Sequence, residues 1–433
     1  MDLFNVVSIK EAKSLIEKNF NVKPIKEEVE LLSSMDRVIY EDIVSHINVP
    51  NFRRSTVDGY AVNSKDVAGA SESMPAMMNY RGEVFMGKIP EVNMDFPGDC
   101  VYVPTGGMIP EGSDSVVMVE YTERVHEDTV LINKATAYGE KVVEIGEDIA
   151  KEEIMIKKGK RLRPYEIGVL SSLGITKVPV CRKPKVAIIS TGDEIVDPNK
   201  EPNLGEVRDI NSYLLQASII EDGGIPINYG IIRDDFNLLK NTVEKAIEDT
   251  DIVLISGGSS VGKKDVTIDV INSLGDPGVF VHVGKKDVTI DVINSLGDPG
   301  VFVHGIAIKP GKPTIIGNVK DKIVFGLPGH PLSAAIVYKV IVKYYIDKIA
   351  GVKEKVFPIV CKFNINYHSA KGREEYLPVT LNWKENEIIA SPIFSKSGLI
   401  SGFSKAYGFM KIDKNLEGIK RMRKYLYIDF RRF

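Results

Sequence analysis

Apolar side chains recur every three or four residues near the start of the chain, a spacing typical of an amphipathic helix. Ser8 and Glu11 lie just before this stripe and have the spacing of a capping box. The pattern therefore predicts a helix over residues 8–20. Charged sequence that favours helix continues to about residue 45.

The pattern then changes to short alternating runs separated by Gly, Pro and Asp, which predicts a small all-β domain over residues 47–147. Residues 146–175 return to a helix-rich pattern. We therefore expect a helical linker domain made of residues 1–46 and 148–182, with the β-domain inserted into it.

A third pattern begins at Lys185, where apolar runs that end in polar residues alternate with amphipathic stretches over residues 211–222 and 236–249. This β-α-β-α-β order predicts a central α/β domain over residues 183–351, with a doubly wound, mostly parallel sheet. A further helix over residues 332–351 closes this domain. Alternating runs return afterwards, so residues 352–433 are expected to form a barrel-like β-domain.

One segment, VGKKDVTIDVINSLGDPGVFVH, occurs twice in succession, at residues 261–282 and 283–304. Old copies would have diverged, so their identity indicates a recent in-frame duplication or an error in the sequence record. Two copies inside a larger domain do not make a stacked array. The sheet has one place for this segment. We therefore expect the chain to re-enter the sheet from His304, and some part of residues 276–303 to bulge outward.

The overall composition excludes several classes of protein. A net charge of −3 lacks the basic field of a nucleic-acid binder. No apolar run reaches the length of about 18 residues that a membrane span requires, and the acidic start does not resemble a signal peptide. Cys100, Cys181 and Cys361 form no CxxC pair, which favours a reducing, cytoplasmic location.

Four loops lie at the predicted strand ends: Ser190–Glu194, Ser256–Asp265, Lys309–Thr314 and Leu327–Pro331. Glycines and serines in the second loop allow backbone N–H groups to approach an anion. Any one of these loops alone is more often an ordinary turn. Four of them in one α/β domain favour an anion-binding site at the carboxyl edge of the sheet.

Carboxylates recur at the same places, namely Asp193, Glu194, Asp234, Asp235 and Asp265. Beside phosphate-type loops, they favour a divalent cation that bridges them to an anionic ligand. The alternative is that Asp235 and Asp265 cap the helices that follow them. The sequence leaves both interpretations open.

Two loops of the predicted β-domain also carry polar groups. Arg53, Arg54 and Asp58 share one, and Thr105 and Glu111 share the other. A solvated loop is the default interpretation of both.

Taken together, the motifs VDGYA, PTGGMIPEGSDSVVMVE, GEDI, ISTGDEIV, SGGSSVGKKD, IAIKPGKPT and LPGHPLSA resemble those of the molybdopterin molybdenumtransferases, the MoeA and gephyrin E-domain family. They follow the family's order over nearly the whole chain. The resemblance implies an enzyme that uses Mg²⁺ to insert molybdate into adenylylated molybdopterin, releasing AMP and giving molybdenum cofactor. It also implies four domains in each subunit of an elongated homodimer.

The resemblance assigns roles to individual residues. It implies that Asp58, Thr105 and Asp148 approach the central pocket of the other subunit. It further implies transient contact with the molybdopterin adenylyltransferase, and no nucleic-acid or membrane partner. The chemistry expected is positioning and electrostatic stabilisation rather than attack by a protein nucleophile.

Within the central pocket, the resemblance implies that Glu194, Asp234 and Asp265 are catalytic carboxylates and Mg²⁺ ligands. The residues expected to hold or shape the anionic ligands are Gly257, Gly258, Ser259, Ser260, Lys309, Lys312, Pro328 and Pro331.

Some positions depart from the family pattern. Val143 and Pro378 stand where arginine is usual, and Ser259 stands where valine or threonine is usual. His330 replaces the commoner Asn or Tyr, and is either a ligand contact or a solvated loop residue.

Two other functions stay open at this point. One is a molybdopterin adenylyltransferase-type enzyme on the same central domain, which the flanking domains argue against. The other is a non-catalytic scaffold, although the chain has no long disordered linker for that role. The sequence does not choose between molybdate and tungstate, which have nearly the same size and charge.

Overall fold

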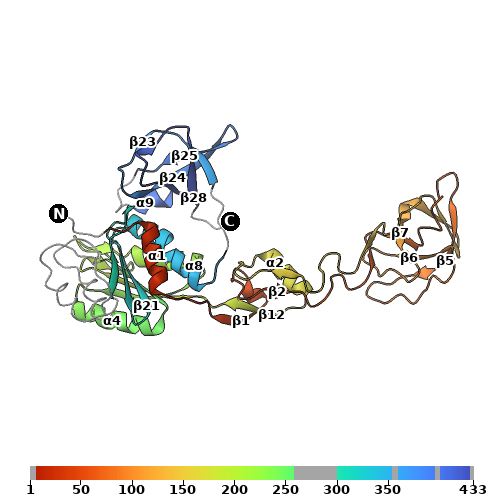
Figure 1. Ribbon diagram of the computed structural model, residues 1–433, viewed down its shortest axis with the longest axis horizontal. Coiled ribbons are helices and arrows are strands. Elements are labelled where there is room, and N and C mark those ends of the chain that lie inside the picture. The colour runs from red at the N-terminus through yellow and green to blue at the C-terminus, as the bar shows by residue number, and fades with distance from the viewer. Residues whose placement is uncertain (1–5, 258–299, 354–358, 395–399, 430–433) are drawn as a thin grey trace. The chain divides into compact units, whose positions relative to one another are not determined.

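The computed structural model describes residues 6–257, 300–353, 359–394 and 400–429 (Figure 1). The chain divides into two compact units. The smaller contains residues 28–35 and 41–179, and the larger joins residues 1–27, 36–40 and 180–433. No helix in the described ranges is long and apolar enough to cross a membrane.

The larger unit is built on a six-stranded sheet with the order β16-β13-β17-β21-β20-β18. The first four strands run parallel, and β20 and β18 add an antiparallel edge. The sheet is therefore mostly parallel, as predicted. The strands are β13 (Lys185–Thr191), β16 (Ile225–Ile232), β17 (Ile252–Ser256), β18 (Val301–His304), β20 (Ile315–Val319) and β21 (Lys322–Leu327).

Two hydrophobic cores cover the two faces of this sheet, because successive side chains of a strand point to opposite faces. Ile252 and Leu254 of β17 belong to one core, whereas Val253 and Ile255 belong to the other. Helix α4 (Phe236–Asp249) packs on the second core. The first core is covered by α1 (Ile9–Asn19), α3 (Asn211–Glu221) and a continuous helical stretch made of α7 (Pro331–Val337), η3 (Tyr338–Val342) and α8 (Lys343–Ile349).

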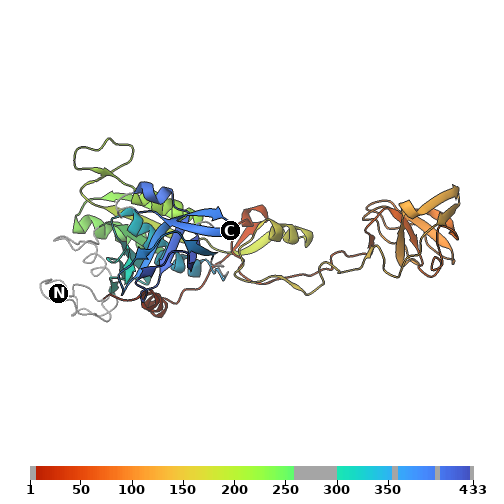
Figure 2. The same cartoon turned by 90° about the horizontal axis from the view of Figure 1, so that it is seen from above.

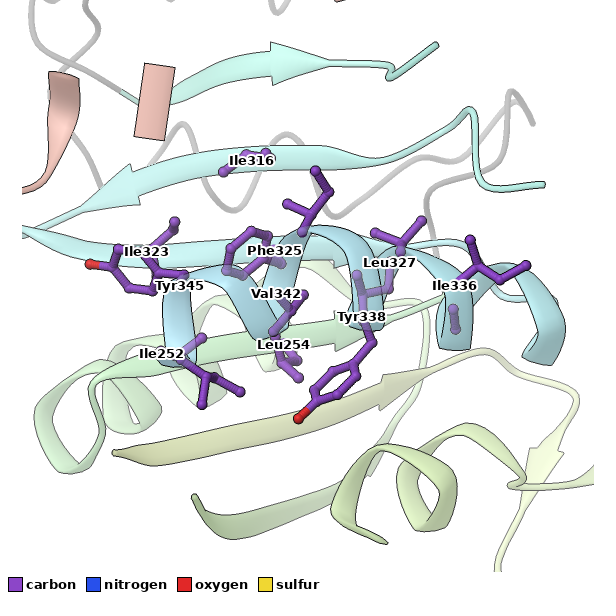
Figure 3. Packing of buried hydrophobic residues seen from close by; sticks show 14 of the residues in the cluster. Ile252, Leu254, Ile316, Ile323, Phe325, Leu327, Ile336, Tyr338, Val342 and Tyr345 are labelled. Carbon is purple, nitrogen blue, oxygen red and sulfur yellow. The ribbon is translucent and has the colours of Figure 1, made fainter. Parts of the chain in front are cut away.

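Figure 3 shows this first core from close by, with Phe325 of β21 beside Val342 and Tyr345. Phe325 and Val342 are fully buried, and Tyr345 is nearly so. The middle of the helical stretch, η3, is a π-helical turn. The predicted helix over residues 332–351 is thus confirmed, and its turn is wider at the π-helical residues 338–342.

Helix α1 confirms the first prediction, since Ser8 and Glu11 form a capping box at its start. The helix packs in the core of the larger unit, beside α8 (Figure 1), and not in a separate linker. Lys348 of α8 binds Glu17 of α1 at 2.6 Å.

The expectation that helix continues from residue 20 to about residue 45 was wrong. Residues 20–46 contain β1 (Lys26–Glu30), η1 (Leu32–Ser34) and β2 (Ile43–Val44), but no α-helix. Strand β2 pairs with β11 (Ile154–Ile156) and β1 pairs with β12 (Lys177–Cys181), so pairing between distant segments outweighs local helix propensity. The α-helix of the second segment is α2 (Pro164–Ser172). Because β2 and β11 flank the β-domain, that domain is an insertion, as predicted.

The inserted β-domain is a six-stranded sheet of order β7-β4-β6-β5-β9-β8, coloured orange in Figure 2. Cores on its two faces include Tyr60 and Val101. The β character predicted for this segment is confirmed. The strands are β4 (Gly59–Val62), β5 (Ala76–Glu83), β6 (Asp99–Val103), β7 (Ser115–Met118), β8 (Thr122–His126) and β9 (Thr129–Ile132), with β3 (Arg54–Ser55) and β10 (Val142–Val143) paired beside them.

The C-terminal sheet closes on itself, because β24 (Glu374–Lys384) pairs with both β25 (Glu387–Pro392) and β26 (Gly408–Ile412). Strands β22 (Ile359–Phe363) and β28 (Lys424–Asp429) complete the ring, so the expected barrel-like domain is observed. The short strand β19 (Ile308–Lys309) leaves the central domain and pairs parallel to β24.

The end of the second copy of the repeat forms β18, and this confirms that the chain re-enters the sheet there. Residues 301–304 pair with β20, and the register shifts between Val301 and Val303. Asp265, Asp287 and the remainder of both copies lie outside the described residues.

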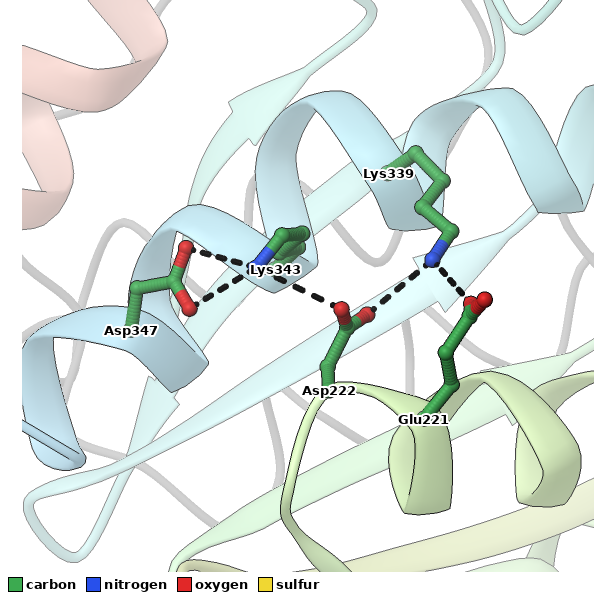
Figure 4. A network of polar contacts seen from close by, with 5 residues as sticks. All are labelled: Glu221, Asp222, Lys339, Lys343 and Asp347. Carbon is green, nitrogen blue, oxygen red and sulfur yellow. Dashed lines mark hydrogen bonds and ion pairs between the residues drawn. The ribbon is translucent and has the colours of Figure 1, made fainter. Parts of the chain in front are cut away.

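A charged cluster joins α3 to the long helical stretch (Figure 4). The two carboxylate oxygens of Asp222 bind Lys339 and Lys343, each at 3.3 Å. Glu221 also binds Lys339, and Asp347 binds Lys343. The side chain of Asp222 is 1% exposed and that of Glu221 is 41% exposed. Asp222 is therefore the carboxylate on which the cluster depends.

We expect Asp222→Asn to lower the free energy of unfolding of the larger unit by about 2 kcal/mol, because a buried charge-assisted contact is lost. Glu221→Gln removes an exposed charge from the same cluster and should cost less than about 1 kcal/mol. Urea denaturation of both variants measures the difference. Equal losses would contradict the central role of Asp222.

Candidate functional site

The ends of β13 and β16 bring two of the predicted carboxylate loops together. Gly192 N–H donates to Ile232 O at 3.3 Å, and Asp234 N–H donates to Asp193 Oδ1 at 3.3 Å. Glu194 is exposed and Asp234 is partly buried at this edge. The predicted pair Glu194 and Asp234 therefore lies on neighbouring strand ends.

Asp235 has a different role. Its carboxylate accepts from Leu238 N–H at 2.9 Å and caps α4. Of the two interpretations left open for Asp235, the cap is confirmed. Asp265 lies outside the described residues.

The residues predicted to bind Mg²⁺ are carboxylates, and carboxylate oxygens together with several waters are the ligands that Mg²⁺ prefers. The part of the chain that the structure describes contains no group of three His, Cys, Asp or Glu side chains that would hold a metal. Glu194 and Asp234 are two of the predicted ligands, and the third, Asp265, lies outside the described residues.

Gly257 directly follows β17, at a point of very close backbone approach. Its φ is +110°, and a Cβ at this position would lie 2.2 Å from Thr191 O. Glycine is therefore required here by packing as well as by backbone conformation. Gly258, Ser259 and Ser260 lie beyond the described range.

Asn211, a residue that the sequence analysis did not single out, joins two of the predicted loops. Its Nδ2 donates to Ser256 Oγ at 2.7 Å and to Gly329 O at 2.8 Å. A carbonyl only accepts, so the atom beside Gly329 O must be the amide nitrogen. Asn211 thus fixes the end of β17 against the LPGHP turn.

The LPGHP turn itself is rigid. Pro328 is buried, and Pro331 is the buried first residue of α7. His330 is exposed and occupies the N-cap position without a side-chain cap. That these two prolines shape the wall of a ligand pocket stays a prediction.

The KPGKPT loop runs along the same edge. Gly311 packs so closely on α7 that an added Cβ would lie 2.6 Å from Val337 Cγ2. Lys312 is partly buried, and its carbonyl accepts from Ile306 N–H and Thr314 N–H. Lys309 belongs to β19 and lies at the seam between the central and C-terminal domains.

A cavity of ≈ 500 Å³ opens beside Lys309. Leu332 lines it from α7, and Tyr367, Tyr376 and Phe394 supply aromatic walls. Tyr367 and Phe394 stack with ring centroids 6.1 Å apart. The position of Leu332 links this cavity to the LPGHP turn directly before it.

Glu375 lines this cavity with its side chain 5% exposed. Oε1 accepts from Lys309 Nζ at 2.9 Å and from Tyr367 OH at 2.7 Å, and Oε2 accepts from Ser369 Oγ. Burial, and then the hydrogen bond to Glu375, raise the pKa of Tyr367, which therefore stays a donor. Sequence reasoning missed Glu375, because the segment GREEY offered only a run of charges.

The remaining predicted residues belong to the smaller unit. Thr105 N–H donates to Asp58 Oδ1 at 2.8 Å, so the VDGYA and PTGG loops do meet. Both side chains are exposed. Asp148 is exposed too, and its backbone N–H donates to Val49 O. None of the described contacts joins Asp148 to Asp58 or Thr105.

Thr191 is 3% exposed, and its hydroxyl has no hydrogen-bond partner among the described residues. Thr250 is equally buried, but its hydroxyl donates to Ala246 O at 2.6 Å. We expect Thr191→Val to leave the free energy of unfolding unchanged or higher, whereas Thr250→Val lowers it by about 1 kcal/mol. Thermal unfolding of both variants tests this. A similar loss in both would mean that the fold needs the hydroxyl of Thr191.

Three family models match the chain in sequence order. Residues 7–174 match the MoeA N-terminal region (domain I and II), and residues 361–421 match the MoeA C-terminal region (domain IV). The model described as "Probable molybdopterin binding domain" matches residues 187–283 and 281–348. These two stretches meet where the copies of the repeat join, so the repeat interrupts a single domain.

Individual proteins resemble the chain over nearly its whole length. A molybdopterin biosynthesis protein of Methanocaldococcus jannaschii is 31% identical, covering 96% of each chain. The molybdopterin molybdenumtransferase of Haemophilus influenzae is 29% identical, covering 94% of this chain and 95% of its own. The crystal structure of the molybdopterin biosynthesis MoeA protein from Pyrococcus horikosii superposes with a TM-score of 0.81 at 37% identity, covering 99% of this chain and 100% of its own.

Proposed function

Because the chain belongs to the MoeA-type molybdopterin molybdenumtransferase family, a transferase family of molybdenum cofactor biosynthesis, we propose that it inserts molybdate into adenylylated molybdopterin and releases AMP. One observation carries the proposal. The described parts of the predicted central loops adjoin one another along one edge of the larger unit. Asn211 ties Ser256 to Gly329, and Leu332 leads from that turn to the cavity of Lys309.

The chemistry of the cavity suits an oxyanion with an organic partner. Molybdate offers only acceptor oxygens in its dianionic form, so it needs N–H donors, and Lys309 supplies them in this cavity. Lys312 belongs to the same KPGKPT loop, although it does not line the cavity. The aromatic walls offer flat apolar surfaces against which the organic substrate can pack. No side chain here is required to attack the substrate. The residues act by holding two reactants in place.

We include Mg²⁺ in the proposal, held by Glu194, Asp234 and Asp265. When bound, the ion would stabilise negative charge that develops on the leaving phosphate. Asp193 supports this arrangement from the protein side, because its carboxylate accepts from the backbone N–H of Asp234 and orders that loop.

The roles of Asp58, Thr105 and Asp148 remain part of the proposal, as does the homodimer in which they would serve the partner's site. Transient contact with the molybdopterin adenylyltransferase is proposed on the chemical ground that some enzyme must supply an adenylylated substrate. A cytoplasmic location agrees with the three thiols, which are buried and free. Burial raises the pKa of Cys100 to about 12 and that of Cys361 to about 11, so both stay protonated.

Molybdate-dependent release of AMP from adenylylated molybdopterin tests the proposal. We expect Lys309→Gln to raise the KM for molybdate about tenfold to a hundredfold, because a charge-assisted donor is lost and Glu375 is left to repel the oxyanion. Lys411→Gln is the matched control, since Lys411 binds the neighbouring Glu374 at 2.7 Å. Its KM should be unchanged.

The same preparation separates the competing functions. ATP-dependent adenylylation of molybdopterin, without molybdate-dependent AMP release, would overturn the proposal in favour of an adenylyltransferase. Substrate binding with no turnover under either condition would favour a scaffold.

A further inference from the structure

The Lys309 cavity contains a cation that is already paired. The ammonium group binds the carboxylate of Glu375, while two hydroxyl groups, of Tyr367 and Ser369, hold that carboxylate in place. Glu375 is almost wholly buried, whereas the side chain of Lys309 is 49% exposed. The carboxylate is therefore the fixed member of the pair.

The charges that line the cavity sum to zero among the described residues. Lys309 contributes one positive charge and Glu375 one negative charge, and the other lining residues are uncharged. Pro378 adds no cation at its position in the wall. Water does not screen Glu375 effectively, because buried charges are screened much less than exposed ones.

This arrangement has two opposed consequences for an oxyanion. An ammonium group has three N–H donors, and Glu375 occupies one, so two stay available to a ligand. The long-range attraction of the lysine for a dianion is nevertheless offset by the repulsion of the carboxylate behind it. The cavity therefore offers N–H donors to an oxyanion, but the Lys309–Glu375 pair carries no net charge to attract it.

We propose that Glu375 is a specificity-determining residue that neutralises Lys309, so that the free oxyanion binds weakly and is held tightly only when the organic substrate is also bound. This inference rests on the proposed function for the identity of the substrates. Its consequence is a preferred order of binding, with adenylylated molybdopterin first. Abundant oxyanions of the same shape, such as sulfate, then do not block the cavity.

A purely structural role for Glu375 makes a different prediction. If the carboxylate only anchors β19 to β24 and orients Lys309, removing its charge should weaken oxyanion binding or leave it unchanged. If it neutralises Lys309, removing its charge should strengthen binding. The sign of the change therefore separates the two roles.

The test is calorimetric titration of the full chain with molybdate alone, and separately with sulfate alone. We expect Glu375→Gln, which keeps the size of the side chain, to bind both anions at least about tenfold more tightly than the unchanged chain. The double variant Lys309→Gln with Glu375→Gln should lose this gain, because the gain acts through Lys309.

Glu374→Gln is the matched control. It removes the same charge from the preceding residue of the same strand, where Glu374 binds Lys411 outside the pair and is 15% exposed. Its affinity for both anions should stay within about twofold of that of the unchanged chain. An equal gain in this control would overturn the proposal, because the effect would then reflect overall charge. Weaker or unchanged binding in a folded Glu375→Gln variant would overturn it too.

Initial-velocity kinetics of the unchanged chain provide a test that needs no variant. Product-inhibition patterns should show the organic substrate adding before molybdate, and molybdate-first or random addition would contradict the inference. The two proposals fail differently. If AMP is not released in a molybdate-dependent reaction, the proposed function is contradicted. The anion titrations measure the effect of Glu375 on oxyanion affinity and need no turnover.

Discussion

Burial of the central sheet on both faces is the constraint on which the rest of the structure depends. Strands β13, β17 and β21 are almost continuously apolar, so helices must cover both faces. Parallel strands that are connected in this way end at one common edge, and their loops meet there. Thr191, Gly257 and Gly329 come together for this reason, before any ligand is considered.

Close packing at this edge leaves little choice of residue. The backbone of Gly257 touches that of Thr191, and Asn211 bridges Ser256 and Gly329. The short strand β19 then carries the chain across to β24, which places Lys309 beside Glu375. The C-terminal domain thus supplies the counter-charge of a lysine that comes from the central domain. One buried carboxylate links the construction of the fold to the electrostatics of the proposed site.

Much of this architecture follows from the spacing of apolar residues. Helices α1, α3 and α4 and strands β13, β16 and β17 were predicted near their observed positions, because each has a clear local period. Strands β2 and β11 were not predicted, since they become strands only by pairing with each other across a whole inserted domain. Such a contact leaves no periodic signal in either segment.

The site was predictable to a similar extent. Gly257, Lys309, Pro328 and Pro331 lie in motifs that are recognisable in the sequence, and the structure places them along one edge. Asn211 binds Ser256, more than 40 residues away, and Glu375 pairs with Lys309, more than 60 residues away, so no local pattern marks either contact. Position 265 and its copy at 287 lie in the repeat, outside the described residues.

We propose that the cavity beside Lys309 holds the molybdate oxyanion. Anomalous diffraction at the molybdenum absorption edge, from crystals of the full chain soaked in saturating molybdate, tests it most directly. We predict a molybdenum peak within hydrogen-bond reach of Lys309 Nζ. A peak at another place in the larger unit, with none beside Lys309, would contradict the claim.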